Sequence, residues 1–178
     1  MNAHLLTIDP SINSMGWALF SPDDTEENYI LDRSGTIKST EGERKGKDEI
    51  RIVVQIMKIR KLVDDELNLA EYGYGDSFMY PVLLLIEKPK LWTNVKSMAS
   101  QRQGGVMILH ILVGALFWFG WQNFENVELV DVSTWKGQLP KSVTLKQVKR
   151  RWNVNPETDD EADAIGIGSW YIDKLAKE

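Results

Sequence analysis

The sequence predicts an α/β domain built around a mixed β-sheet. The first 40 residues hold three strand-like segments joined by short connections, and helical and strand patterns alternate after them. The chain has 178 residues, of which 43% are hydrophobic and 26% charged. It is therefore long enough and apolar enough to form one domain, residues 1–178, with its own core.

Three strands are predicted at the start of the chain. Leu5–Asp9 is a short apolar run that ends in a carboxylate, and the apolar segment 15–20 follows a turn-rich stretch. A third strand is expected around 34–39, before the polar segment 40–47, which we expect to be an exposed loop. Because the connections between the strands are short, we expect an antiparallel meander.

A helix and a buried strand are predicted next. From 48 to about 72 the apolar residues recur at helical spacing, and one stripe contains Ile52, Ile56, Ile59 and Val63. The run 81–87 is continuously apolar but too short for a typical helix, which indicates a central strand buried on both faces. Like the first strand, it ends in a carboxylate, that of Glu87.

Residues 93–120 are predicted to be helical, and the stretch 104–121 is nearly all apolar. Its 18 residues approach the length of a membrane span. We reject a span, because it would place the carboxylates that end the two strands across the bilayer from the acidic C-terminus. We expect a helix buried between the sheet and a second subunit, with Leu112 at the contact and with Trp118 and Trp121 in the core or the interface.

The last third of the chain predicts a strand at 127–132, a loop at 133–141 and helices at 142–152 and from about 160 to 175. Pro156 separates the two helices. The predicted order of elements is therefore β-β-β-α-β-α-β-α-α.

The composition excludes several kinds of site. There is no cysteine, which excludes disulfides, thiolate zinc sites and a cysteine nucleophile. The two histidines, His4 and His110, are too few for a histidine-rich metal site, and neither lies near a recognisable nucleophile motif. Gly104-Gly105 lacks the following Lys-Ser/Thr of a Walker phosphate loop. No signal peptide is visible, so the cytoplasm is the expected location.

The formal net charge of −5 is unevenly distributed along the chain. Residues 1–87 carry −7, residues 88–151 carry +7, and residues 152–178 carry −5. Screening confines such fields to about 10 Å at ordinary salt, so a basic middle can bind phosphates although the whole chain is acidic. The basic residues cluster further at 136–151, where we infer a local phosphate-binding surface.

Four carboxylates stand apart from the other acidic residues. Asp9 and Glu87 each end an apolar strand, where an uncompensated charge is costly. Asp160 and Asp163 are three residues apart at the start of the last predicted helix, so they share a face. Each acid alone is more often structural, as a strand end or a helix cap. If the four converge, their repulsion requires a cation, and an all-oxygen site suits Mg²⁺ or Mn²⁺.

In this order and spacing, the motifs resemble those of the RuvC family of Holliday junction resolvases. The resemblance covers Leu6–Pro10 with Gly16, Leu85–Glu87, the Gln-x-x-Gly-Val region at 101–106, and the closing Asp-x-x-Asp-Ala motif in Asp160–Ile165. Two departures look more like the viral or phage branch, for which the location would be the host cytoplasm. Ser11 stands where the cellular family commonly has Gly, and the segment 21–50 is longer and more acidic.

The resemblance implies a ribonuclease H-like fold, with a five-stranded mixed β-sheet flanked by α-helices, that acts as a homodimer on four-way DNA junctions. It also implies two Mg²⁺ ions per active site, for which Mn²⁺ can substitute. The family's metal-binding acids match Asp9, Glu87, Asp160 and Asp163. Lys136 and Lys146 are similar to family lysines that contact the junction or assist the active site.

This reading predicts phosphodiester hydrolysis with two cations about 4 Å apart, which activate water and stabilise the leaving oxygen. Asp9 is expected to bridge the cations, because it ends the central strand. Glu87 and Asp163 would each complete one cation's shell, with Asp160 beside Asp163. Lys146 is the candidate for stabilising charge on the scissile phosphate, and its alternative is a phosphate clamp or a solvated helix face.

The DNA contacts are expected on both sides of the predicted active site. Backbone phosphates would be bound by Lys136, Lys141, Lys149, Arg150 and Arg151. A second DNA arm would be held by Lys88, Lys90, Lys96 and Arg102. Trp92 is expected to stack on an unpaired base at the branch point.

Three other functions remain open from the sequence. A nuclease of the same fold would act on flaps, branched replication intermediates or RNA–DNA hybrids. An actin-like ATPase also opens with a strand, an Asp and a glycine-containing turn, but it uses two lobes, and this chain has the length of one. A catalytically inactive module would bind junctions without using Mg²⁺, and the presence of all four acids argues against it.

Overall fold

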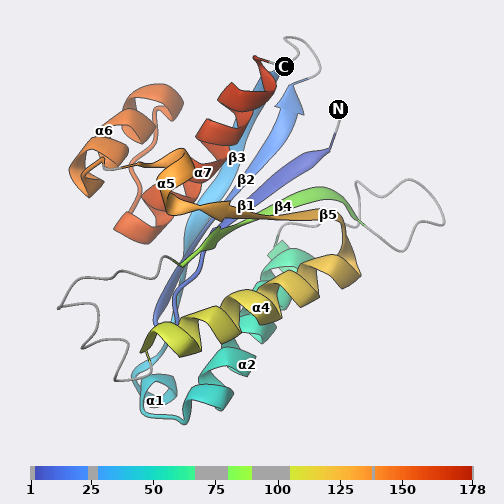
Figure 1. Cartoon of the computed structure of the whole chain (residues 1–178), viewed down its shortest axis with the longest axis vertical. Helices are drawn as coiled ribbons and strands as arrows, with labels where there is room; N and C mark the ends of the chain where they lie inside the picture. Colours follow the sequence, from blue (N-terminus) through green and yellow to red (C-terminus); the bar gives the residue numbers. More distant parts are fainter. Residues whose placement is uncertain (1–2, 24–27, 67–79, 90–104, 138, 178) are drawn as a thin grey trace.

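A computed structural model describes residues 3–23, 28–66, 80–89, 105–137 and 139–177. Its centre is a five-stranded sheet with the strand order β3-β2-β1-β4-β5. Helices cover both faces of this sheet (Figure 1). Helices α2 and α4 pack on one face, and α5, α6 and α7 lie over the other.

The strands form a mixed sheet, as predicted. They are β1 (His4–Asp9), β2 (Ser14–Asp23), β3 (Asn28–Lys38), β4 (Tyr80–Lys88) and β5 (Phe124–Asp131). Strands β1, β2 and β3 form the predicted antiparallel meander, whereas β4 is parallel to both β1 and β5. Strand β1 is therefore the central strand, with an antiparallel neighbour on one side and a parallel neighbour on the other.

Strand β2 is longer than the sequence pattern indicates. Residues 21–23 include Pro22 and suggest the end of a strand, yet they continue to pair with residues 28–30 of β3. Proline is tolerated near a strand end, because it removes only one N–H from the ladder. The meander therefore reaches further along the sheet than its apolar segments alone indicate.

The helices follow the predicted order, with short additions in two predicted loops. They are α1 (Glu41–Arg44), α2 (Asp48–Lys61), the π-helical turn η1 (Leu62–Glu66), α4 (Gly105–Asn123), α5 (Val132–Trp135), α6 (Lys141–Trp152) and α7 (Asp159–Leu175). Helix α1 forms in the predicted loop 40–47 because Thr40 and Glu43 make a capping box. The helical positions predicted at 67–72 and 93–104 lie outside the described residues.

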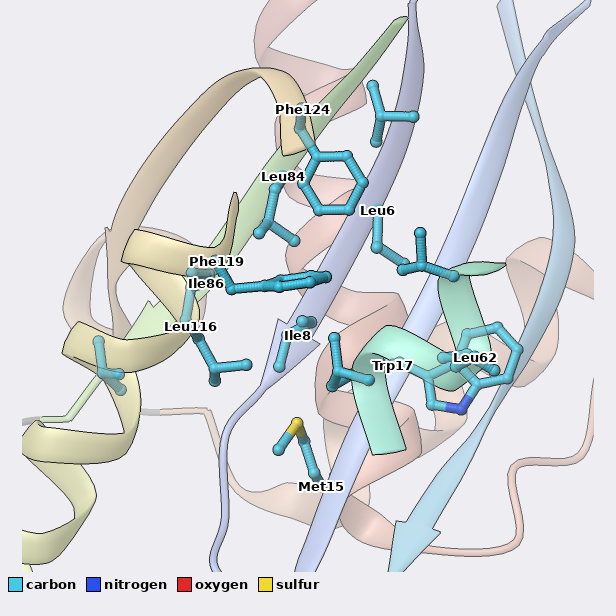
Figure 2. Close-up of a cluster of buried hydrophobic side chains, with 14 of the residues drawn as sticks. Leu6, Ile8, Met15, Trp17, Leu62, Leu84, Ile86, Leu116, Phe119 and Phe124 are labelled. Carbon is cyan, nitrogen blue, oxygen red and sulfur yellow. The ribbon is translucent and has the colours of Figure 1, made fainter. Parts of the chain in front are cut away.

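Alternation along β1 divides the core into two layers. Leu6 and Ile8 point into the cluster beneath α2 and α4, which Figure 2 shows, and Leu5 belongs to the cluster beneath α7. Strand β4 is buried on both faces in the same way, since Leu84 and Leu85 are fully buried in opposite clusters. The continuous apolar run of β4 is thus explained, as predicted, by two-sided burial.

Helix α4 has one buried face and one exposed face. By length and composition it could cross a membrane, but its buried residues pack on the sheet. Leu112 is fully buried in the core. The prediction that Leu112 lies at a subunit contact is therefore wrong. Trp118 and Trp121 are each 62% exposed, so they do not belong to the core.

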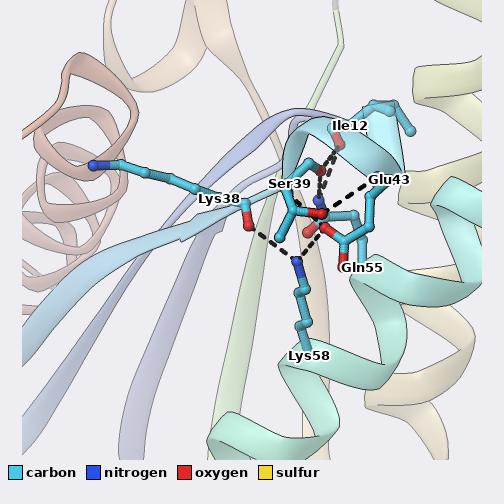
Figure 3. A network of polar contacts seen from close by, with 7 residues as sticks. Ile12, Lys38, Ser39, Glu43, Gln55 and Lys58 are labelled. Carbon is cyan, nitrogen blue, oxygen red and sulfur yellow. Dashed lines mark hydrogen bonds and ion pairs between the residues drawn. The ribbon is translucent and has the colours of Figure 1, made fainter. Parts of the chain in front are cut away.

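A buried polar network holds the turn that follows β1 (Figure 3). The Nε2 of the fully buried Gln55 on α2 donates to the carbonyl of Ile12 at 2.9 Å and to Oγ of Ser39 at 2.7 Å. The Ser39 hydroxyl also donates to the Ile12 carbonyl at 2.9 Å. Lys58 adds an ion pair with Glu43 at 2.7 Å. These bonds tie the turn after β1 to α2 and to the end of β3.

The first turn of α7 lies close against β2. Gly16 pairs with Asp9 in the sheet, and a Cβ on Gly16 would collide with the backbone of Asp160. The buried Thr7 hydroxyl donates to the carbonyl of Ala164 at 2.7 Å, which ties α7 to β1 as well. The absence of a side chain at Gly16 therefore lets the start of α7 lie beside the end of β1.

We expect Gly16→Ala to force the first turn of α7 away from β2, because the clash is with backbone atoms that no side-chain rotation can relieve. The expected loss of unfolding free energy is about 1–3 kcal/mol, measured by urea denaturation. Gly42→Ala on α1 is the matched control, since nothing lies within 4 Å of its Cβ position. Equal stability of the two variants would contradict this close approach.

Candidate active site

Four acidic side chains converge at one end of the sheet. Asp9 ends β1, and Glu87 lies in the adjacent parallel strand β4, where Ile8 pairs with Ile86. Asp160 and Asp163 lie in the first turns of α7, and their charges act on Asp9 together with that of Glu87. The strands are neighbours and the helix begins beside their ends, as predicted. The role of the four acids as metal ligands stays a prediction.

Burial and the neighbouring acids disfavour ionisation of Asp9 and Glu87. Burial raises the pKa of Asp9 well above its ordinary value, and the charges of Glu87, Asp163 and Asp160 raise it further. Burial likewise raises the pKa of Glu87 to about 7, although a hydrogen bond from Trp135 opposes the rise. The arrangement therefore favours whatever positive charge can approach the acids.

Two lysines supply positive charge at this point. Lys136 Nζ donates to both carboxylate oxygens of Asp163, at 2.5 and 2.6 Å, and both side chains are about nine-tenths buried. Burial alone would lower the pKa of Lys141, but Asp159, Asp163, Asp160 and Asp9 together raise it. Both ammonium groups thus interact with the acidic cluster.

Lys146 lies elsewhere on the same surface. It is exposed on α6, whose buried residues Thr144 and Val148 face the core, and its charge is not among those that act on Asp9 or Glu87. Its predicted catalytic role stays a prediction. Among the described residues, Lys136 is the lysine that bonds directly to one of the four acids.

Trp135 is a site residue that the sequence did not single out. Its indole Nε1 donates to Oε2 of Glu87 at 2.8 Å. Among seven tryptophans, packing is the default role for any one of them. A signal was available, because Trp135 precedes Lys136 directly, in a polar segment that offers few apolar neighbours in sequence.

Glu161 lies between Asp160 and Asp163 in the sequence, but its carboxylate bonds to other parts of the chain. Its side chain is buried and accepts hydrogen bonds from the hydroxyl of Ser34 at 2.7 Å and from the backbone N–H of Glu157 at 2.8 Å. The Thr158 hydroxyl caps the helix by accepting from the Glu161 N–H at 3.1 Å. Glu161 therefore anchors the start of α7 to β3, which fixes the helix that carries Asp160 and Asp163.

The donor set fits a divalent cation by its chemistry. All four side chains offer carboxylate oxygens, which suit Mg²⁺ and Mn²⁺, and a cation would relieve the unfavourable ionisation of Asp9 and Glu87. As they stand, no three Asp, Glu or His side chains of the described residues are arranged to hold a metal ion directly. Both Asp163 oxygens accept from Lys136, so the ammonium group competes with a metal ion for this carboxylate.

The predicted DNA-binding residues divide into three groups. Lys149 and Arg150 are exposed on α6 and have no ion-pair partner among the described residues. Others pair with nearby acids: Lys136 with Asp163, Lys88 with Asp131 at 3.7 Å, Lys141 with Asp159 at 3.6 Å, and Arg151 with Asp173 at 2.8 Å. The rest lie outside the described residues: Lys90, Trp92, Lys96 and Arg102.

No protein-family model and no curated protein sequence matches the chain. Solved structures are similar to it over nearly its whole length, among them the following three. Thermus thermophilus RuvC in complex with a Holliday junction substrate has a TM-score of 0.57 at 13% identity, and the match covers 96% of each chain. The yeast mitochondrial Holliday junction resolvase Ydc2 has a TM-score of 0.60 at 12% identity, with 99% of this chain and 82% of that one covered.

The third similar structure is the fowlpox virus resolvase with substrate Holliday junction DNA. Its TM-score is 0.51 at 14% identity, and the match covers 96% of this chain and 99% of that one. At identities this low, the structural similarity establishes the fold alone, and the activity has to be argued from the site. The chain therefore has the ribonuclease H-like fold in the form found in RuvC-type resolvases.

Proposed function

We propose that this chain is a metal-dependent DNA endonuclease that resolves four-way junctions by paired, symmetric nicks. The observation that carries the proposal is the convergence of Asp9, Glu87, Asp160 and Asp163 at the end of the central strand. Their order along the chain is that of the family motifs, and the fold is that of junction resolvases. Two of those resolvase structures contain junction DNA.

The acids would hold the divalent cations on which hydrolysis depends. When bound, two such cations activate a water and stabilise the leaving oxygen of a phosphodiester. Asp9 is proposed to bridge them, because it lies at the centre of the cluster and feels the charge of all three other acids. Glu87 would serve one side, and Asp163 with Asp160 the other. Lys136, once released from Asp163, would lie beside the scissile phosphate as a stabilising charge.

Helix α6 offers a surface for the phosphate backbone. It packs against α7, whose first turns carry two of the site acids, and its outer face presents basic side chains to solvent. These exposed residues are Lys146, Lys149 and Arg150. Contacts of this kind position DNA without reading its sequence, and they weaken steeply with salt.

The exposed face of α4 is proposed to pack against a second copy of this chain. Five exposed residues of α4 are separated alternately by four and three positions, which is typical of a helix–helix seam: Met107, Ile111, Gly114, Trp118 and Trp121. A contiguous apolar stripe on a soluble chain favours burial in an interface. A dimer with two-fold symmetry would place two active sites on a junction of approximate two-fold symmetry.

We expect Asp9→Asn to reduce cleavage of a synthetic four-way junction in Mg²⁺ by at least about 100-fold, because it removes the proposed bridging charge. Junction binding, measured by gel shift, should be unchanged or tighter, because repulsion between the acids and phosphate decreases. Flaps and RNA–DNA hybrids assayed in parallel separate the proposal from the other nucleases of this fold. Equal cutting by parent and variant would contradict the metal role of Asp9, and preferential cutting of flaps or hybrids would contradict junction specificity.

We expect the metal-free protein to lose stability as the pH rises from about 4.5 to about 7. Folded Glu87 keeps its proton up to a pKa of about 7, whereas the unfolded carboxyl releases it near 4.5. The native state therefore binds more protons in this window, and stability falls as they leave. Urea unfolding in a chelator at several pH values measures the slope. Glu87→Gln should flatten it, and an unaltered profile in that variant would contradict the raised pKa.

We expect Ile111→Glu to convert a dimer to monomers, measured by light scattering at micromolar concentration, because a charge in the seam would be buried without a partner. Ile30→Glu on β3 is the matched control, since Ile30 is 49% exposed and Ile111 is 52% exposed. The control should stay dimeric, and both variants should still unfold cooperatively on heating, which shows that each one folds. A dimeric Ile111→Glu variant, or a monomeric parent, would contradict the proposed interface.

A further inference from the structure

The short helix α5 presents two consecutive side chains to two different site acids. The backbone N–H groups of Lys136 and Gly137 both donate to the carbonyl of Val132, at 3.0 and 3.2 Å. Gly137 has a φ of +59°, in the left-handed region that favours glycine, so it ends the turn. This tight turn brings Trp135 to Glu87 on β4 and Lys136 to Asp163 on α7.

The contact between Trp135 and Glu87 is directional. An indole has one N–H and no acceptor, and Nε1 of Trp135 lies 2.8 Å from Oε2 of Glu87. The bond uses one lone pair of Oε2 and fixes the plane of the carboxylate, and Oε1 accepts no hydrogen bond from the described residues. Lys136 Nζ also lies 5.2 Å from the centre of the Trp135 ring, so the indole lies beside the ion pair of Lys136 with Asp163 as well.

The indole ring packs against α7, the helix that carries Asp163. A Cβ on Gly166, three residues further along α7, would lie 2.6 Å from Cζ3 of Trp135 and 3.2 Å from Cγ2 of Thr144. Any side chain at Gly166 would thus push the ring away from α7. The same ring lines a groove of about 530 Å³ between α6 and α7, so displacement would carry it toward open space.

We propose that Trp135 is a positioning residue of this site, whose indole N–H fixes the orientation of the Glu87 carboxylate. Its ring can pack closely against α7 because Gly166 has no side chain. The inference rests on the proposed function, because its consequence is metal binding by Glu87. It assigns a separate role to α5, which couples a strand acid to a helix acid through adjacent residues. Trp135 acts through Glu87 and has no contact with the substrate assigned to it.

The first test compares Trp135→Phe with Trp152→Phe by calorimetric titration of Mn²⁺ into the full chain without DNA. Trp152 is the matched control, because its Nε1 also makes one hydrogen bond, to Ser169 Oγ at 2.7 Å, away from the acids. We expect Mn²⁺ affinity to fall by about tenfold or more in Trp135→Phe and to stay at the parent value in Trp152→Phe. Parent affinity in Trp135→Phe would overturn the proposal.

The second test changes Gly166, against which the indole ring packs, and leaves Trp135 itself unchanged. Gly166→Ala should weaken Mn²⁺ binding in the same direction as Trp135→Phe, whereas Gly42→Ala, with an open Cβ position, should not. Melting curves of all variants report whether each one folds. A folded Gly166→Ala variant with parent affinity would overturn the role given to Gly166.

The third test needs no substitution in Trp135. In ¹H–¹⁵N spectra of the parent, the indole signal of Trp135 should move on addition of Mg²⁺ and in Glu87→Gln, while that of Trp152 stays in place. A Trp135 signal that responds to neither change would overturn the proposal, since a purely structural tryptophan would behave in that way.

The outcomes separate this inference from the proposed function. A parent that binds Mn²⁺ and cuts junctions, with Trp135→Phe indistinguishable from it, overturns the inference alone. A parent whose Mn²⁺ binding depends on Trp135 but which cuts no junction overturns the proposed function alone. A parent that binds no Mn²⁺ contradicts the metal site and overturns both.

Discussion

Electrostatic repulsion among four carboxylates at the end of β1 is the constraint on which the rest of the site depends. Asp9 is disfavoured as an anion by burial and by three acidic neighbours, and Glu87 has a pKa of about 7. Such a cluster is stabilised either by protonation of its acids or by compensating positive charge. In this structure Lys136 provides part of it by pairing with Asp163. The same imbalance is the physical basis for the proposal that the site binds divalent cations.

The fold brings the acids together through close backbone approaches more than through the acids themselves. Gly16 lets the start of α7 lie against β2, and Thr7 bonds to the Ala164 carbonyl from the centre of the sheet. Buried Gln55 ties the turn after β1 to α2. Small or neutral residues thus supply the rigidity on which the charged residues depend, since repelling carboxylates contribute no stability of their own.

Helix α4 shows how one apolar segment meets two requirements. Its residues around Leu112 and Leu116 complete the core against the sheet, and the stripe that includes Ile111 and Trp118 stays exposed. The apolar run in the sequence therefore reflects two surfaces, of which the folded chain buries one. This division explains why a helix of membrane-like composition packs on a sheet and still keeps one apolar face exposed.

The sequence by itself determined the order of elements, the central position of the two apolar strands and the identity of the four acids. Periodicity and charge placement are local properties, and the ends of Leu5–Asp9 and of the run at 81–87 mark those acids directly. Only the tertiary structure decided which lysine and which tryptophan lie at the acids. No sequence pattern distinguishes Lys136 from Lys146. The turn at Gly137 and the close packing at Gly166 direct Lys136 and Trp135 toward the acids, whereas Lys146 stays exposed. Such choices depend on contacts between segments far apart in the chain, which no local pattern records.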